Sequence, residues 1–278
     1  MKRHAYLLLI AMLCLTACSK GNRQAKQLLN QAIAAFEAGE LENSKNMIDS
    51  IKILYPKAYE TRHAGNELMR QVEKSIQQRN INYLDSTMQV RLNQVEEIKS
   101  QYAYERDTAY QETGRYLDPT QVIEKNTSRS YLRFQTEEDG RMSLTSIYVG
   151  NTNIHHTSVK VTAPDGTYVE TPSSTDSYET TDLGKYIEKA EYPMGKDGGL
   201  ATFICEHAKE NLKMQFTGDR TANIPLTPAD RQACVKVYEL SRLLSDITSI
   251  KAQIEDAQTK IRFIDQMAEK AVENSDKD

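Results

Sequence analysis

The chain lacks tryptophan and has only five histidines and four cysteines among 278 residues. It contains no G-x-x-x-x-G-K-[ST], G-x-G-x-x-G, G-x-S-x-G or H-E-x-x-H motif, so the common nucleotide, hydrolase and zinc-protease signatures are absent. Its first apolar run, residues 5–17, is shorter than the about 20 residues that cross a bilayer. We therefore predict a protein that is not an enzyme, has no cofactor or metal and has no membrane-spanning helix.

The N-terminus has the pattern of a secretory signal. Lys2 and Arg3 precede an apolar stretch, residues 7–15, and polar residues follow from Ser19. The end of this stretch, "LTAC", resembles the lipobox of bacterial lipoproteins. The resemblance implies a signal peptide over 1–17, cleavage before Cys18, a diacylglycerol on its sulfur and an acyl chain such as palmitate on its new amino group. An ordinary cleaved signal or a short anchor is the alternative.

The lipobox resemblance also implies a location in the cell envelope. Ser19 is not the aspartate that retains lipoproteins in the inner membrane, so we expect an outer-membrane protein that faces the periplasm. Without residues 1–17 the 35 basic residues lose Lys2 and Arg3, and 33 of them face 39 acidic residues. This net charge of −6 does not favour binding to nucleic acid. Cys205 and Cys234 remain in a compartment that permits disulfides, and the sequence leaves open whether they pair.

Residues 18–65 predict a helical hairpin behind the lipidated N-terminus. Gly39 suits the turn and Pro56 the end of the second helix, and the spacing resembles one tetratricopeptide repeat. The body of the chain also resembles uncharacterised lipoproteins of anaerobic gut-type bacteria, which implies no substrate.

Two long helices are predicted on either side of a β-rich segment. Residues 66–113 lack proline and glycine and form the first coiled-coil arm, followed by a linker, 114–129. Residues 227–278 form the second arm and a polar tail, with Thr227 as cap, Pro228 at the start and Asp230 in the first turn. Apolar residues of the second arm advance by three and four: Leu240, Leu243, Ile247, Ile250, Ile254, Ala257, Ile261, Ile264, Ala268 and Ala271. We expect an antiparallel coiled-coil hairpin; homo-oligomerisation through the coil is the alternative.

Residues 130–226 have the pattern of a small antiparallel β-sandwich. About eight short runs of β-forming residues, among them "LATFICEHA", alternate with turns such as "EEDG" and "APDG". The predicted fold class is therefore α+β: an N-terminal helical hairpin, a long antiparallel coiled-coil hairpin, and a β-sandwich inserted between the two coiled-coil arms.

Two candidate metal sites are weak. His155, His156, Cys205 and His207 carry zinc-binding groups, but adjacent strand residues point to opposite faces. The acidic segment with Glu170, Asp176, Glu179 and Asp182 lacks the EF-hand spacing, so we interpret it as a solvated loop.

The candidate partner surface is a group of tyrosines. Tyrosine is favoured at interfaces because it buries area and keeps a polar tip. Packing between the helical arm and the β-rich segment is the competing interpretation of these rings. The group comprises Tyr102, Tyr104, Tyr110 and Tyr116.

These patterns together favour a lipid-anchored envelope protein of structural or adaptor type. It would present a β-sandwich head on a coiled-coil stalk to an envelope protein partner. The alternative is a ligand-binding lipoprotein whose head recognises glycan or peptidoglycan.

Overall fold

The computed structural model describes residues 2–107, 109, 113–193 and 195–275, without the side chains of 2–19 and 272–275. It is 51% helical and 23% strand, and the strand pairings described are antiparallel, which confirms the α+β class. None of the described helices is both long and apolar enough to pass through a membrane. The chain divides into a helical unit, 1–86 with 252–278, and a β-rich unit, 87–251.

The helical unit is built from α1 (Lys2–Glu37), α2 (Leu41–Leu54), the first part of α3 (Tyr59–Lys99) and the last part of α5 (Pro228–Ser275). Gly39 has a φ of +77°, so the predicted turn between the first two helices is present. Ser44 on α2 donates a 2.8 Å hydrogen bond to the carbonyl of Ala32 on α1. Within this unit α3 contacts α5 through an ion pair between Lys74 and Asp265, 2.6 Å long.

One hydrophobic cluster fills the helical unit. Its residues recur mostly at intervals of three, four or seven, as in amphipathic helices which bury one face. The buried members are Ala25, Leu29, Ala32, Leu41, Ile48, Ile51, Ala58, Leu68, Met69 and Val72.

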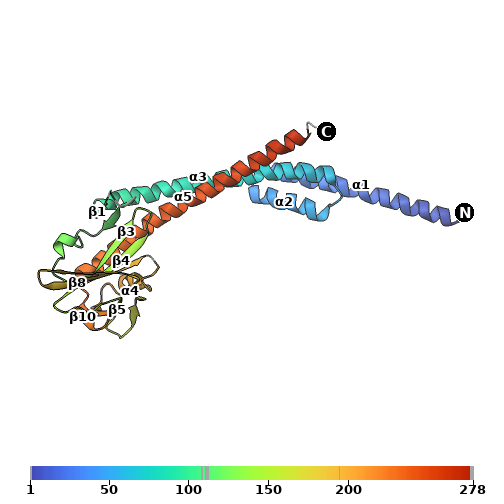
Figure 1. Ribbon diagram of the computed structural model, residues 1–278. Helices are drawn as coiled ribbons and strands as arrows, with labels where there is room; N and C mark the ends of the chain where they lie inside the picture. Colours follow the sequence, from blue (N-terminus) through green and yellow to red (C-terminus); the bar gives the residue numbers. More distant parts are fainter. Residues whose placement is uncertain (1, 108, 110–112, 194, 276–278) are drawn as a thin grey trace. The chain divides into compact units, whose positions relative to one another are not determined.

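The β-rich unit contains two sheets (Figure 1). The six-stranded sheet has the order β1-β2-β3-β4-β8-β7, and the four-stranded sheet has the order β10-β9-β5-β6. The strands of the first are β1 (Ala103–Glu105), β2 (Arg115–Leu117), β3 (Tyr131–Glu137), β4 (Met142–Gly150), β7 (Asp176–Asp182) and β8 (Lys185–Pro193). Those of the second are β5 (Ser158–Thr162), β6 (Tyr168–Glu170), β9 (Lys213–Thr217) and β10 (Thr221–Pro225). Two short helices, η1 (Ile123–Lys125) and α4 (Leu200–Glu206), complete the unit.

Both sheets contribute to one hydrophobic cluster, together with α4 and the start of α5. Phe134 and Leu144 come from the six-stranded sheet, and Val159 and Phe216 from the four-stranded sheet. These side chains are almost entirely buried. Buried and half-buried positions alternate from Met142 to Ser146 in β4, with the period of two expected for a strand with one buried face, and Ile147 and Tyr148 are then both buried.

The predicted start of α5 is confirmed. The helix begins at Pro228, and the backbone N–H of Asp230 donates a 3.1 Å hydrogen bond to Oγ1 of Thr227.

In the β-rich unit this part of α5 packs against the end of α3. Leu240, Leu244 and Ile247 cluster with Val95, and Arg91 lies 3.2 Å from Asp246.

The predicted first arm, residues 66–113, is wrong at its end. α3 stops at Lys99, and residues 103–105 form strand β1, which pairs with β2. No proline or glycine marks this stop. The tyrosine-rich stretch suits a strand as well as a helix, and the pairing of Tyr104 with Tyr116 decides between them. The second predicted helix is present as α5. Because α3 ends early, the two long helices differ in length, with 41 residues in α3 and 48 in α5.

Two further segments were predicted wrongly. "LATFICE", expected as a strand, forms α4, because Leu200, Phe203 and Ile204 share one buried helix face. The acidic segment 176–182, expected as a loop, forms strand β7. It joins β8 through Leu183 and Gly184, whose φ values of +46° and +75° fit a tight hairpin turn. All residues of β7 are exposed, so it carries no alternation that would reveal a strand.

Candidate functional site

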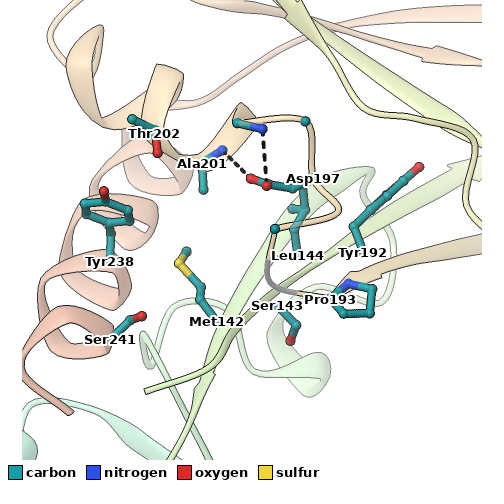
Figure 2. Close-up of a pocket in the computed structure, with 13 residues that line it drawn as sticks. Met142, Ser143, Leu144, Tyr192, Pro193, Asp197, Ala201, Thr202, Tyr238 and Ser241 are labelled. Atoms are coloured by element: carbon teal, nitrogen blue, oxygen red, sulfur yellow. Dashed lines mark hydrogen bonds between the residues drawn. The ribbon is translucent and has the colours of Figure 1, made fainter. Parts of the chain in front are cut away.

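The β-rich unit contains a cleft of about 340 Å³. Four elements surround it: β4 and the end of β8 on one side, and α4 and α5 on the other (Figure 2). Its labelled lining residues are Met142, Ser143, Leu144, Tyr192, Pro193, Asp197, Ala201, Thr202, Tyr238 and Ser241.

A glycine-rich loop forms one rim of the cleft. Gly195, Gly198 and Gly199 have φ values between +65° and +86°, which other residues rarely adopt. A Cβ atom on Gly198 would lie 2.8 Å from the carbonyl oxygen of Glu170, so this loop passes too close to β6 for a side chain. Gly198 is thus required by this close approach, whereas Gly195 and Gly199 are favoured only by their backbone conformation.

Asp197 holds the loop against α4. Its Oδ1 accepts a 3.2 Å hydrogen bond from the backbone N–H of Gly199, and its Oδ2 accepts a 2.9 Å bond from that of Ala201 (Figure 2). The carboxylate therefore satisfies backbone donors at the start of α4.

The chemistry of the lining suits binding. Met142, Leu144 and Ala201 are buried apolar residues at the wall, while Tyr238 and Thr202 supply hydroxyl groups at accessible positions. Asp197 is the one carboxylate among the residues that line the cleft, and its oxygens are engaged by the backbone. The arrangement can accept a small apolar group and hydrogen-bond a polar edge of it.

A second polar cluster lies in the interior of the same unit. Glu188 on β8 accepts hydrogen bonds from three consecutive backbone N–H groups, those of Ile154, His155 and His156, at 2.6, 3.1 and 2.7 Å. Its Oε2 also lies 3.0 Å from Nδ1 of His156. His155 has a φ of +49°, which turns these N–H groups toward one carboxylate.

Ser146, His156 and Glu188 are connected in the order of a catalytic triad. Oγ of Ser146 lies 2.8 Å from Nε2 of His156, and Nδ1 of His156 faces Glu188. All three residues are at most 2% exposed, however, and Ser146 does not line the cleft. Burial lowers the pKa of His156, against the opposing effect of Glu188, so the ring is held neutral. In this form the cluster fixes the 151–156 loop to the sheet. The sequence offered no signal for it, because the three residues are far apart.

The residues considered for zinc are distributed over separate contacts. His155 pairs with Glu179, His207 with Glu210, and Cys205 faces Cys234. The residues considered for calcium likewise fall on two strands, β6 and β7. Among the described residues, no three histidine, cysteine, aspartate or glutamate side chains are placed to hold a metal ion.

The tyrosine group is brought together by β1 and β2 instead of by a helix. The rings of Tyr104 and Tyr116 lie 5.0 Å apart between centroids, and Tyr104 is 46% exposed. Tyr102 is partly buried and donates a 2.9 Å hydrogen bond to the carbonyl of Lys236 on α5. Its burial, with a smaller effect of Glu239, raises its pKa to about 12. Tyr110 lies outside the described residues. Tyr102 and Tyr116 are half-buried and pack against the cluster of Val95 and Leu240, whereas Tyr104 is exposed.

The side chain of Cys18 also lies outside the described part of the chain. Cys205 on α4 and Cys234 on α5 are close together, with sulfur atoms 3.8 Å apart and both thiols free. The sequence could not supply this distance, because it follows from the position of a helix that was expected to be a strand.

Comparison with known protein families, with curated proteins and with solved structures gives no match to the chain.

Proposed function

We propose that the protein is a lipid-anchored protein of the cell envelope, of structural or adaptor type, that binds a protein partner through its β-rich unit. The lipobox ending at Cys18 supports the anchor. The cleft carries the binding proposal, because its apolar wall and hydroxyl-bearing rim suit the insertion of one apolar side chain.

The arrangement proposed for the whole chain is a β-sandwich head on an antiparallel coiled-coil stalk. Support for the antiparallel direction comes from the β-rich unit, where Arg91 on α3 meets Asp246 and Tyr102, just after α3, meets Lys236, so residue numbers fall on α5 as they rise on the other segment. In the helical unit Lys74 on α3 meets Asp265 on α5. Support for the sandwich is the cluster to which both sheets contribute. Deleting one heptad from each long helix should leave the β-rich unit folded but abolish its binding to the envelope partner in cells.

Site-specific photocrosslinking in intact cells tests the partner. A photoreactive amino acid at Thr202, which is exposed and lines the cleft, should capture a discrete protein. The same group at Glu206, exposed on α4 but outside the cleft, is the matched control. Capture at both positions, or at neither, would argue against the cleft as the binding site.

A filled cleft provides an independent test. Thr202→Trp places an indole at the accessible rim without removing a core side chain, so folding should persist while binding of the captured partner falls. Binding of peptidoglycan fragments that is lost in Tyr238→Ala but kept in Glu206→Ala would instead favour the glycan-binding alternative, since aromatic rings stack on sugars.

The anchor is tested on the N-terminal peptide. Mass spectrometry of protein taken from the membrane fraction should show diacylglycerol on Cys18 and no residues before it. An unmodified Cys18 in a soluble protein would refute this part of the proposal.

A further inference from the structure

Residues 53–59 of the helical unit expose an unusual number of apolar side chains. Ile53, Leu54 and Tyr59 are 76%, 63% and 74% exposed. Pro56 lies between them and prevents the backbone from continuing as a helix. Arg62 donates a 2.8 Å hydrogen bond to the carbonyl of Pro56, which fixes the segment in place. Such a group of exposed apolar residues marks an interaction site.

Basic residues of α1 lie beside this segment. A hollow of about 300 Å³ is lined by Gly21, Asn22 and Leu54, together with residues 55–58. A second hollow of about 550 Å³ shares Asn22 with the first and is lined by Arg23 and Lys26. Lys57 lines both hollows. One hollow is therefore apolar and the other is basic, and they meet at Lys57.

The charge of this patch, residues 20–26 with 53–59, is one-sided. Arg23, Lys26 and Lys57 line the two hollows, and Glu60 is the one acidic residue that does so. Lys20 adds a further exposed basic side chain. Apolar and aromatic side chains beside basic ones are the combination that binds at the boundary between lipid headgroups and acyl chains.

The position of the patch in the sequence, close to Cys18, indicates that it binds a lipid surface. Cys18 precedes Gly21 by three residues, a distance of at most about 11 Å even for an extended chain. A lipid on Cys18 would therefore hold the patch at the bilayer surface. We propose that the patch docks on that surface and binds anionic phospholipid, with Arg23, Lys26 and Lys57 at the headgroups and Leu54 and Tyr59 inserted between them. This inference rests on the proposed lipid anchor.

The absence of tryptophan makes the test direct. Tyr59→Trp introduces one tryptophan into the full mature protein, and Tyr83→Trp, at a position that is 69% exposed on α3, is the control. The proteins are reconstituted in vesicles of phosphatidylcholine with 30% phosphatidylglycerol, with acyl chains brominated to quench buried indoles. We expect blue-shifted and strongly quenched emission from residue 59 and unchanged emission from residue 83. Unquenched emission at residue 59 would overturn the proposal.

Charge variants test the headgroup contact. Each basic residue near an anionic surface strengthens binding about fivefold, so Lys57→Glu in the Tyr59→Trp protein should sharply reduce quenching. Lys209→Glu, an exposed lysine of the β-rich unit, should leave it unchanged. Equal quenching in both variants and in pure phosphatidylcholine vesicles would contradict recognition of anionic lipid.

The same samples separate this inference from the proposed anchor. The mass of the N-terminal peptide reports the lipid on Cys18 independently of the fluorescence. If Cys18 carries lipid and residue 59 stays unquenched, the patch proposal fails alone. If Cys18 is unmodified, the anchor fails, and flotation of the protein with anionic vesicles decides whether the patch binds them.

Discussion

Ser241 on α5 donates a 2.7 Å hydrogen bond to the carbonyl oxygen of Gly140, in the turn between β3 and β4. Ser245 reaches the same oxygen at 3.1 Å, and Thr248 donates to the carbonyl of Asp139 at 3.0 Å. Three hydroxyls, one turn apart on the helix, therefore hold one hairpin. Because Ser241 also lines the cleft, this contact fixes the side of the cleft that α5 provides.

Gly140→Ala should destabilise the protein strongly. Gly140 has a φ of +87°, and a Cβ atom there would lie 2.2 Å from the backbone nitrogen of Ser245. Left-handed strain costs about 1–2 kcal/mol, and each lost hydrogen bond about 1 kcal/mol, so we expect a loss of about 3–5 kcal/mol in urea unfolding.

Gly166→Ala is the matched control for Gly140→Ala. Gly166 has a nearly identical φ of +90° but open space around it. Its substitution should cost only the strain, about 1–2 kcal/mol. Equal losses for the two variants would show that the hairpin does not press on α5.

Arg129→Met should also be costly, because Arg129 pairs with a buried carboxylate. Its guanidinium donates two hydrogen bonds, 2.7 and 2.8 Å long, to Asp230, whose side chain is 1% exposed. Removing one partner of a fully buried pair costs about 3–5 kcal/mol, but the Arg129 side chain is 35% exposed, so solvent screening lowers the expected cost. The contact with Thr227 remains, so we expect a value near the lower end by denaturant unfolding.

Lys260→Met supplies the comparison for Arg129→Met. Lys260 lies 2.7 Å from Asp256 on α5, with both side chains more than half exposed. An exposed pair contributes about 0–1 kcal/mol, so this variant should unfold almost as the parent does. A similar small loss in Arg129→Met would mean that Asp230 is adequately stabilised by its other contacts.

The parts of this fold that the sequence predicts are those with a local physical signal. The start of α5 follows from Thr227 and Pro228, and the turn at Gly39 follows from the backbone freedom of glycine. The end of α3 and the strand β7 have no such signal: the first depends on the pairing of β1 with β2, and β7 is exposed along its whole length. The cleft could not be predicted because its lining comes from four elements that are separated in the sequence, β4, β8, α4 and α5.

Stability should fall as the solution becomes acidic, because His156 is buried in its neutral form. Burial lowers its pKa in the folded protein, whereas an unfolded histidine takes up a proton near its ordinary value of about 6.5. The unfolded state therefore binds more protons below this pH. The contribution of His156 is complete above about pH 6.5 and is lost as the pH falls toward the folded pKa, by up to about 1.4 kcal/mol per pH unit.

His155 acts in the opposite direction and must be removed from the comparison. A hydrogen bond with Glu179 raises its pKa, so its contribution is present below pH 6.5 and is lost as the pH rises through the folded pKa. Unfolding curves between pH 8 and 5.5 should be measured for His155→Gln with and without His156→Gln. If the free energy of unfolding changes with pH equally with and without His156→Gln, His156 is not the source of the pH dependence.

Cys205 and Cys234 should form a disulfide on exposure to a small-molecule disulfide such as oxidised glutathione. Their sulfur atoms are 3.8 Å apart, so only a small adjustment separates them from bonding distance. The hydrogen bond with Cys234 lowers the pKa of Cys205, and burial holds the pKa of Cys234 well above its usual range. Cys205 is thus the attacking thiolate: it forms a mixed disulfide and releases one glutathione thiol, and Cys234 then displaces the second.

The order of attack has a distinct signature in intact mass. In a parent chain in which Cys14 and Cys18 are replaced by serine, oxidation should remove two hydrogen atoms, while adding Cys234→Ser should stop the reaction at the mixed disulfide with one glutathione attached. Cys205→Ser should stay unmodified in the folded state, because Cys234 is fully buried, and should react only in denaturant. A parent protein that carries glutathione without closing the bond would show that α4 and α5 hold the two sulfur atoms too rigidly to join.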